Sequence, residues 1–310
     1  MVKRKPVIID CDPGHDDAIA LLLAFASDKL DVKAVTTVAG NQTIDKTFNN
    51  ALKVLSFAGI NTVVSKGAAK PLVRDLITAP EVHGESGLDG PILPPPTLKP
   101  SDKTAVETII GILKESDEKI TFIPTGPLTN VATVLLSEPE VKNKIERIVL
   151  MGGSMIGGNW TPAAEFNIVV DPEAASIVFN SGIPITMCGL DVTHKAQIYK
   201  EEIEKIRNIG NKVGVMVAEL LDFYSKFYER FGFKGSPLHD PVAVAYVIDS
   251  TLVKSKMCHV DIETKGEFTD GCTVVDYYNI TQKSKNVEVV LDIDRERFIN
   301  MLYEALKKYN

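Results

Sequence analysis

The sequence predicts an α/β fold with a doubly wound, mostly parallel central sheet and helices on both faces. Short runs rich in β-branched residues alternate with segments of helical periodicity. This alternation is typical of βαβ units, which build parallel sheets of the Rossmann-like kind. The chain has 310 residues with no internal repeat or clear linker, so we expect one domain spanning residues 1–310.

The expected elements follow the chain in order. The predicted strands are Val7–Asp12, Val32–Val38, Thr62–Ser65, Lys119–Pro124, Arg147–Met151, Pro184–Cys188, His259–Thr264, Thr273–Asn279 and Val287–Ile293. The predicted helices are Asp17–Ala26, Ile44–Phe57, Leu128–Leu136, Lys200–Ile209, Val213–Phe231, an apolar helix opened by His239-Asp240-Pro241, and a final helix after Ile293. Because parallel sheets bind ligands beyond the carboxyl ends of their strands, we expect the functional residues there.

Two irregular stretches interrupt this pattern. Lys66–Pro100 is rich in glycine and proline and contains His83, and Gly152–Pro162 is glycine-rich and ends near Asn159 and Trp160. Irregular loops this long are uncommon unless they are functional or mobile. We therefore expect His83 to lie on a lid.

Composition and charge exclude several classes of protein. The net charge of -7 argues against a nucleic-acid polymer as partner. The four cysteines form no CxxC pair, which fits buried free thiols in a reducing compartment. The apolar run Val7–Ile9 is too short for a signal peptide, and no stretch approaches the roughly 20 apolar residues of a membrane span. We expect a cytoplasmic protein with no membrane association.

Four carboxylates gather at the end of the first predicted strand. Asp10 and Asp12 are two residues apart and so point to one face of the strand. After a Pro-Gly turn, Asp16 and Asp17 fall at a helix N-terminus, where negative charge is favourable. So many like charges need a counter-charge, and all-oxygen ligands favour Ca²⁺ or Mg²⁺ over Zn²⁺. Ca²⁺ suits a cage made mostly by protein, so we expect Ca²⁺.

Further polar residues follow later strands or open later helices. They are Asn41, Thr125, Glu165, Asn167, His239 and Asp240. Each is weak evidence alone, because an aspartate can cap a helix and an asparagine can fill a turn. Together they supply the donors and acceptors that sugar hydroxyls require.

In sequence order these motifs resemble one family. Asp10-Cys11-Asp12-Pro13-Gly14-His15-Asp16-Asp17-Ala18 is similar to the DxDPGxDDA signature of the inosine–uridine-type nucleoside hydrolases. The agreement continues through Val38–Asn41, His83-Gly84, Pro124–Asn130, Val149–Gly153, Ala164–Asn167 and His239-Asp240, and so covers residues 7 to 245. The bacterial pyrimidine-preferring ribonucleoside hydrolases resemble the chain most.

The resemblance implies calcium-dependent hydrolysis of the N-glycosidic bond of ribonucleosides to ribose and free base, with pyrimidine nucleosides favoured. It implies a role in salvage and a homo-oligomer, a tetramer rather than a dimer. It makes Asp12 the general base and a calcium ligand, and His239 our candidate for assisting the leaving base. The implied metal ligands are Asp12, Asp17, Asp240 and Thr125 through its carbonyl; the ribose-binding residues are Asp16, Asn41, Asn159, Glu165 and Asn167; the base-binding residues are His83, Phe166, Phe227, Phe231 and His239.

The chain departs from the family on the predicted helix Val213–Phe231. The relatives carry a glutamine and a tyrosine that contact the base, and here Phe227 and Phe231 fall at those places. Phenylalanine stacks but donates no hydrogen bond, which weakens the prediction of base preference and leaves the reaction unaffected. His15 lies within the first signature at a place where the family varies, so no chemistry is assigned to it.

Three other interpretations remain open. A phosphatase of the haloacid-dehalogenase type also opens with DxD, but the continuation Pro13–Asp17 does not fit it. A calcium-stabilised nucleoside-binding protein would need no general base such as Asp12. A hydrolase of a purine, modified or phosphorylated nucleoside is the third, and Arg74 or Arg230 could then approach a phosphate.

Overall fold

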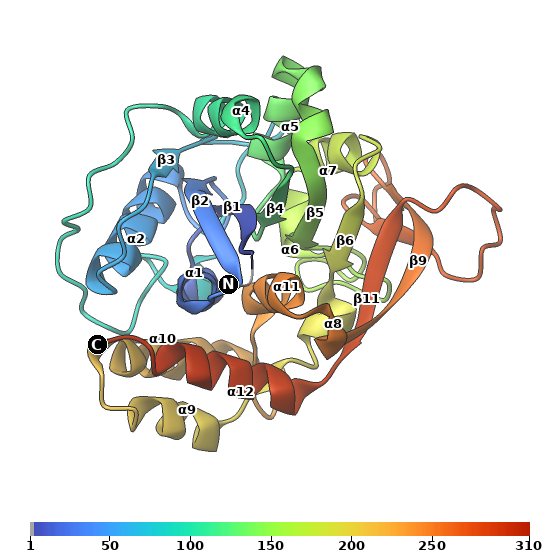
Figure 1. Ribbon diagram of the computed structural model, residues 1–310. Helices are drawn as coiled ribbons and strands as arrows, with labels where there is room; N and C mark the ends of the chain where they lie inside the picture. Colours follow the sequence, from blue (N-terminus) through green and yellow to red (C-terminus); the bar gives the residue numbers. More distant parts are fainter. Residues whose placement is uncertain (1–2) are drawn as a thin grey trace.

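A nine-stranded sheet runs through the protein, shown by a computed structural model that describes residues 3–310 (Figure 1). The strand order is β10-β9-β11-β6-β5-β4-β1-β2-β3. Neighbouring strands from β11 to β3 pair in parallel, whereas β9 pairs antiparallel with both β11 and β10. The predicted α/β fold with a mostly parallel sheet is confirmed.

The helices and strands have the following bounds. The strands of the main sheet are β1 (Lys5–Cys11), β2 (Leu30–Thr37), β3 (Val64–Lys66), β4 (Ile120–Pro124), β5 (Ile145–Met151), β6 (Ile185–Cys188), β9 (Val253–Ile262), β10 (Thr273–Asp276) and β11 (Val287–Ile293); β7 (Gln197–Ile198) and β8 (Ser236–Pro237) form a small separate ribbon. The helices are α1 (His15–Ala26), α2 (Ile44–Phe57), α3 (Pro80–His83), α4 (Ala105–Glu115), α5 (Thr129–Ser137), α6 (Phe166–Val170), α7 (Pro172–Phe179), α8 (Leu190–Thr193), α9 (Lys200–Arg207), α10 (Lys212–Glu229), α11 (His239–Ile248) and α12 (Arg295–Leu306), with 3-10 turns η1 (Pro139–Lys144) and η2 (Ser250–Leu252).

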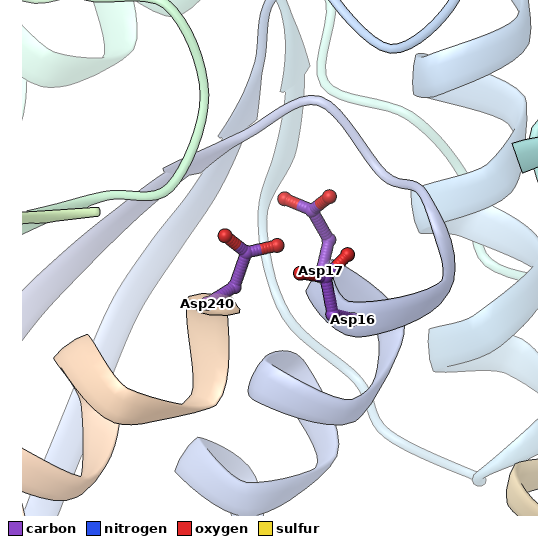
Figure 2. A group of neighbouring side chains, drawn as sticks. All are labelled: Asp16, Asp17 and Asp240. Atoms are coloured by element: carbon purple, nitrogen blue, oxygen red, sulfur yellow. The ribbon is translucent and has the colours of Figure 1, made fainter. Parts of the chain in front are cut away.

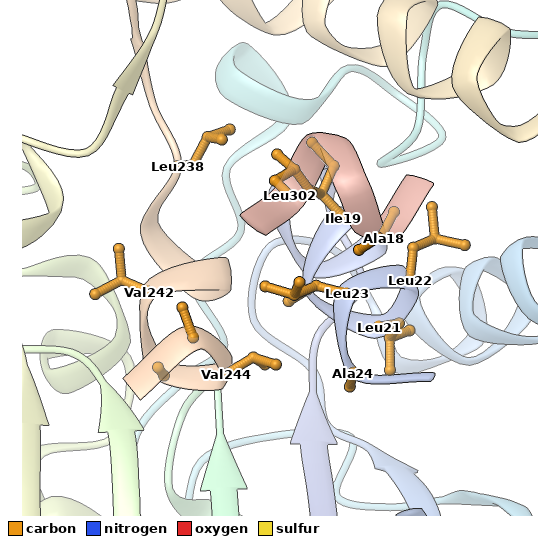
Figure 3. Packing of buried hydrophobic residues seen from close by; sticks show 14 of the residues in the cluster. Ala18, Ile19, Leu21, Leu22, Leu23, Ala24, Leu238, Val242, Val244 and Leu302 are labelled. Carbon is orange, nitrogen blue, oxygen red and sulfur yellow. The ribbon is translucent and has the colours of Figure 1, made fainter. Parts of the chain in front are cut away.

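Buried side chains cover both faces of the sheet. Alternate residues of β1 point to opposite sides, so Val7 and Ile9 join one hydrophobic cluster and Ile8 joins the other. The first cluster packs α1, α11 and α12 against the sheet, as the side chains around Leu302 show (Figure 3). The second lies under α4, α5 and α7. A sheet covered on both faces explains why its strands read as continuous apolar runs.

Most predicted elements are present with shifted ends. Helix α1 begins at His15, two residues earlier than expected, because Gly14 is its N-cap. Helix α10 ends at Glu229, so Phe231 lies just beyond it. Strand β9 begins at Val253 and is longer than expected. Helices α4 and α7 were not predicted.

The sheet brings one set of strand ends together. Strands β1, β2, β4 and β5 are neighbours or near neighbours, and each is followed by a segment that carries predicted site residues. The long segment 67–104 contains only the short helix α3, which ends at His83. Among residues 3–310, no helix is long and apolar enough to cross a membrane.

Candidate active site

The loop between β1 and α1 is held in place by its own aspartates. Asp17, in the first turn of α1, accepts the Gly14 N–H at 2.9 Å and the Asp12 N–H at 3.3 Å. Asp12 Oδ2 accepts the backbone N–H of Asn41 at 2.7 Å, which ties this loop to the one after β2. The turn therefore closes on itself and presents three carboxylates at the strand end.

Asp240 joins these carboxylates from the start of α11. Asp16, Asp17 and Asp240 each offer an oxygen, and the three oxygens lie within 4.8 Å of one another (Figure 2). All three residues are buried. Three buried carboxylates at this separation repel one another unless a cation or a proton lies between them.

Asp12, directly after β1, is the fourth buried carboxylate of the acidic site. Its side chain is fully buried, and its Oδ1 has no hydrogen-bond partner among the described residues. Gly126 leaves room for this oxygen, because a Cβ there would come within 2.5 Å of it. An unpaired buried carboxylate oxygen beside three others fits a hard cation. The cluster of three includes Asp16, to which the resemblance gives a ribose-binding role, and does not include Asp12.

Burial dominates the electrostatics of this acidic site. It raises the pKa of Asp12 and Asp240 well above the usual range, and like charges raise both further, from Asp17 in the first case and from Asp16 in the second. The pKa of Asp16 rises to about 7, chiefly through burial and then through Asp17. No lysine or arginine lines the cleft above the site among residues 3–310. The carboxylates therefore lack a protein counter-charge, which a divalent cation would supply.

Thr125 links the acidic site to Asn167, one of the residues predicted to bind ribose. Its hydroxyl donates to Asp17 Oδ1 at 2.8 Å, and its carbonyl accepts a hydrogen bond from Asn167 Nδ2 at 2.8 Å. Thr125 directly follows β4, the strand next to β1, so its position comes from the sheet. A carbonyl oxygen has a second lone pair, which leaves Thr125 able to bind a cation as the resemblance implies.

Above the acids lies a cleft of about 380 Å³. The five residues predicted to bind ribose all line it: Asp16, Asn41, Asn159, Glu165 and Asn167. Asn159 is exposed and the other four are buried, and they reach the cleft from α1, from the loop after β2, from the segment before α6 and from α6 itself. The structure thus brings together residues separated by more than 120 positions.

Glu165 is fixed as the N-cap of α6. Its carboxylate accepts N–H groups from Gly153 at 2.9 Å, Asn167 at 3.0 Å and Ile168 at 3.3 Å. Burial raises its pKa to about 7, although these three hydrogen bonds favour the charged form. The carboxylate is therefore rigid, and it titrates near neutral pH.

The outer part of the cleft is aromatic. The predicted base-binding residues all line it: His83, Phe166, Phe227, Phe231 and His239. Phe231 is 66% exposed at the rim, whereas Phe166 is buried. An apolar wall above a polar floor suits a ligand with a planar ring and a hydroxylated end.

Both ring nitrogens of His239 lie within hydrogen-bond distance of neighbouring hydroxyl groups. Its Nδ1 lies 2.7 Å from the Thr193 hydroxyl, and its Nε2 lies 2.8 Å from the Tyr228 hydroxyl. Tyr228 in turn lies 3.0 Å from the Tyr224 hydroxyl. Burial lowers the pKa of His239 well below its usual range, so the ring is neutral at pH 7.

Sequence reasoning missed Tyr224, Tyr228 and Trp160, which also line the cleft. Tyr224 and Tyr228 are four residues apart on α10 and so share one helix face, a spacing visible in the sequence. The hydrogen-bonding groups that Phe227 and Phe231 lack come from these tyrosines.

His15 is also closer to the cleft than the sequence suggested. It is fully buried, stacks on Phe223 with a centroid separation of 5.2 Å, and contacts His83 through Nδ1 at 3.2 Å. Burial lowers the pKa of His15 to about 4 and that of His83 well below its usual range. Both rings are therefore neutral at pH 7.

A larger cavity lies elsewhere. It has a volume of about 860 Å³, lies between α9 and α12, and contains none of the predicted site residues. Its arginine, Arg295, is already paired with Glu202 at 2.6 Å. The predicted site residues therefore line the smaller cleft over the acids.

Comparison with known proteins agrees with this geometry. Residues 7–300 match the family model described as inosine-uridine preferring nucleoside hydrolase. The pyrimidine-specific ribonucleoside hydrolases RihA of an Enterobacter species and of Photobacterium profundum are each 56% identical over 308 residues, which cover 98% of this chain and 98% and 99% of theirs.

Solved structures give the same result. The purine-preferring ribonucleoside hydrolase from Gardnerella vaginalis superposes with a TM-score of 0.92 at 34% identity and covers 98% of both chains. A plant nucleoside hydrolase superposes with a TM-score of 0.91 at 33% identity and covers 98% of this chain and 99% of its own.

Proposed function

The chain belongs to the inosine–uridine preferring nucleoside hydrolase family, and from this premise we propose that it hydrolyses pyrimidine ribonucleosides in a calcium-dependent reaction. Members of the family cleave the N-glycosidic bond and release ribose and the free base. The proposed preference for uridine and cytidine is supported by two 56%-identical relatives named pyrimidine-specific. The observation that carries the calcium-dependent mechanism is the set of four buried aspartates beneath a polar cleft.

Asp12, Asp17, Asp240 and the Thr125 carbonyl would hold the cation. Their donors are all oxygen atoms, which favours Ca²⁺ or Mg²⁺, and a site made mostly of protein groups favours Ca²⁺. Asp16 lies close enough to contribute a further oxygen. The cation would lower the pKa of a water molecule at this site.

Asp12 is the proposed general base. Its Oδ2 is held by the Asn41 N–H, while its Oδ1 has no partner among the described residues and so is available for a proton. In the reaction Asp12 accepts a proton from the attacking water, and the water oxygen bonds to C1′ of the ribose as the bond to the base breaks. The bonding electron pair leaves with the base.

The ribose-binding residues orient C1′ and stabilise its charge. The sugar becomes oxocarbenium-like in the transition state, and the buried carboxylates of Asp16 and Glu165 stabilise that positive charge. Rigid partners for the hydroxyls place C1′ beside the attacking water, which removes much of the entropic barrier. Glu165 is suited to this because three backbone N–H groups fix it.

The leaving base receives help through Tyr228 in this proposal. His239 Nδ1 lies 2.7 Å from the Thr193 hydroxyl and its Nε2 lies 2.8 Å from the Tyr228 hydroxyl, and the proposal takes the tautomer in which Thr193 donates to Nδ1 and Nε2–H donates to the Tyr228 oxygen. In this arrangement the Tyr224 hydroxyl, 3.0 Å away, also donates to the Tyr228 oxygen, which leaves the Tyr228 O–H to donate to the departing base. His239 is a positioning residue in this scheme, because its pKa lies too low for it to act as an acid at pH 7.

A purine or modified nucleoside is the second candidate substrate, since one superposed relative is purine-preferring. A phosphorylated nucleoside is disfavoured. Arg74 forms ion pairs with Glu173 at 2.8 Å and with Asp270, so it is not free to bind phosphate, and Arg230 does not line the cleft. The homotetramer, the cytoplasmic location and the role in salvage stay predictions.

Ribose release tests the proposal. Purified protein is incubated with uridine, cytidine, inosine and adenosine, with excess chelator or with added Ca²⁺, and free ribose is measured. We expect ribose from uridine and cytidine fastest, loss of activity with chelator, and recovery with Ca²⁺. Release from purine nucleosides alone would support the second candidate. Binding without any ribose release would support a non-catalytic nucleoside-binding protein.

A further inference from the structure

We propose that His15 lets His83 present either a hydrogen-bond donor or an acceptor to the nucleobase, and so lets one cleft accept both uridine and cytidine. This inference rests on the proposed pyrimidine nucleoside hydrolysis and deepens it. His15 itself does not line the cleft. It acts through His83 and is therefore a positioning residue.

The proton on His15 has a fixed place. Its Nε2 lies 2.8 Å from the carbonyl oxygen of Asp89, and a carbonyl can only accept a hydrogen bond. Nε2 must therefore carry the proton, and the Nδ1 of the neutral ring is a lone pair. The stacked ring of Phe223, with an interplanar angle of 4°, prevents the imidazole from turning over.

His83 meets two different groups of His15 with the same nitrogen. His83 Nδ1 lies 3.2 Å from the backbone N–H of His15, a donor, and 3.2 Å from His15 Nδ1, an acceptor. Gly14 allows this close approach, because a Cβ there would lie 2.4 Å from His83 Nδ1. If His83 Nδ1 carries the proton, it donates to His15 Nδ1; if it does not, it accepts the backbone N–H. Each tautomer thus has a partner.

The other ring nitrogen of His83, Nε2, is the one that would contact the nucleobase, and its protonation depends on the tautomer. His83 lines the cleft, and its Nε2 has no hydrogen-bond partner among residues 3–310. Nε2 is an N–H donor in one tautomer and an acceptor in the other. Uracil and cytosine differ at N3 and at the 4-substituent, where each donor of one base is an acceptor in the other. A histidine whose Nδ1 has a partner in either tautomer can satisfy both bases.

Two substitutions of His15 separate this role from a structural one. In His15→Gln the amide reaches the Asp89 carbonyl, but the acceptor at the position of Nδ1 is lost, so only the backbone N–H holds His83. His83 then presents a fixed donor. In His15→Asn an amide oxygen lies near the position of Nδ1, so both tautomers of His83 keep a partner.

The readout is the ratio of kcat/KM for uridine to kcat/KM for cytidine. We expect His15→Gln to shift this ratio about tenfold, because one substrate leaves a buried polar group unpaired, and His15→Asn to stay within about twofold of the wild type. Equal ratios in all three proteins would overturn the inference. If the wild type hydrolyses neither nucleoside, the proposed function fails instead.

A spectroscopic measurement tests the same idea without a change at position 15. In the Asp12→Asn variant with uridine or cytidine bound, ¹⁵N shifts of His83 report which ring nitrogen is protonated. We expect Nε2 protonated with one nucleoside and Nδ1 with the other. The same tautomer in both complexes would refute the proposal, whatever the His15 variants do.

Discussion

The two carboxylate oxygens of Asp12 have different tasks because they have different surroundings. Oδ2 is held by a backbone N–H, whereas Oδ1 is buried without a partner among the described residues. A buried oxygen without a partner lowers the stability of the folded state. The proposed roles of Asp12 as cation ligand and as base account for this unpaired oxygen. The sequence placed Asp12 at a strand end but could not show which oxygen is free.

At the same scale, Tyr228→Phe removes the hydroxyl that the proposal assigns to the leaving base. We expect kcat for uridine to fall about 10²-fold with little change in KM, because the hydroxyl acts mainly in the transition state. The activity on p-nitrophenyl riboside should be unchanged, since that leaving group needs no assistance.

Tyr309→Phe is the matched control. It also removes a hydroxyl that donates a hydrogen bond, to the Leu22 carbonyl at 2.6 Å, but far from the cleft. An equal loss of activity on both substrates in Tyr228→Phe would argue for a structural role of Tyr228.

Individual site residues were predictable from sequence to different degrees. The gathering of Asp12, Asp16 and Asp17 was predictable from their spacing after one strand, whereas Asp240 joined them only through the family resemblance. Tyr224 and Tyr228 were missed because a tyrosine on an amphipathic helix looks the same whether it faces the core or a cleft. The contact between His15 and His83 joins residues 68 positions apart, and no local pattern encodes it.

At the scale of elements, the segment 67–79 leads into α3, and the ion pairs of Arg74 hold it against the rest of the protein. The guanidinium of Arg74 contacts Glu173 on α7 through two hydrogen bonds of 2.8 Å and 2.9 Å and also pairs with Asp270 before β10. These contacts connect the predicted lid segment to α7 and to the residues before β10. The loop therefore has less conformational freedom to lose when a substrate binds.

Arg74→Ala should loosen this loop. We expect KM for uridine to rise about fivefold with kcat changed less than twofold, since a bidentate, partly buried ion pair contributes about 1 kcal/mol. Steady-state kinetics gives both constants. Arg207→Ala, which removes ion pairs to Glu204 and Asp222 on the surface, is the control and should leave KM unchanged. Equal KM values in both variants would contradict the tethering role.

Elements were predicted best where periodicity was strong. Ile44–Phe57 was predicted with the bounds that α2 has, because its apolar residues recur on one face. Helix α4 was missed because no element was predicted between Pro100 and Lys119, although Thr104 and Glu107 form a capping box that signals a helix start. The ends of α1 and β9 differ because caps and tertiary pairing decide them.

At the scale of the whole molecule, the fold gathers negative charge at one edge of the sheet. Asp10, Asp16 and Glu165 each have a pKa raised to about 7, mainly by burial. In the unfolded chain these groups lose their protons near pH 4. Between pH 6.5 and 8 the folded state without a cation therefore binds more protons than the unfolded state, so its stability falls as pH rises.

We expect the melting temperature of chelator-treated protein to fall by at least about 2 °C between pH 6.5 and 8. The buried histidines, whose pKa is lowered, oppose this fall only in part, because the histidines of the unfolded chain have a pKa near 6.5 and are mostly neutral above pH 7. Added Ca²⁺ should abolish the fall, since it stabilises the ionised carboxylates. A scan by differential scanning calorimetry checks both. A melting temperature that rises with pH in the chelated protein would contradict the raised pKa values of Asp10, Asp16 and Glu165.

The central claim is that Asp12 activates water at a cation site, and Asp12→Asn tests it most directly. Single-turnover ribose release from saturating uridine is measured at saturating Ca²⁺, with bound Ca²⁺ determined in the same sample. The account predicts a fall of about 10²- to 10⁴-fold relative to the wild type while Ca²⁺ still binds. A rate within about tenfold of the wild type would contradict it and require another group to take the proton from water.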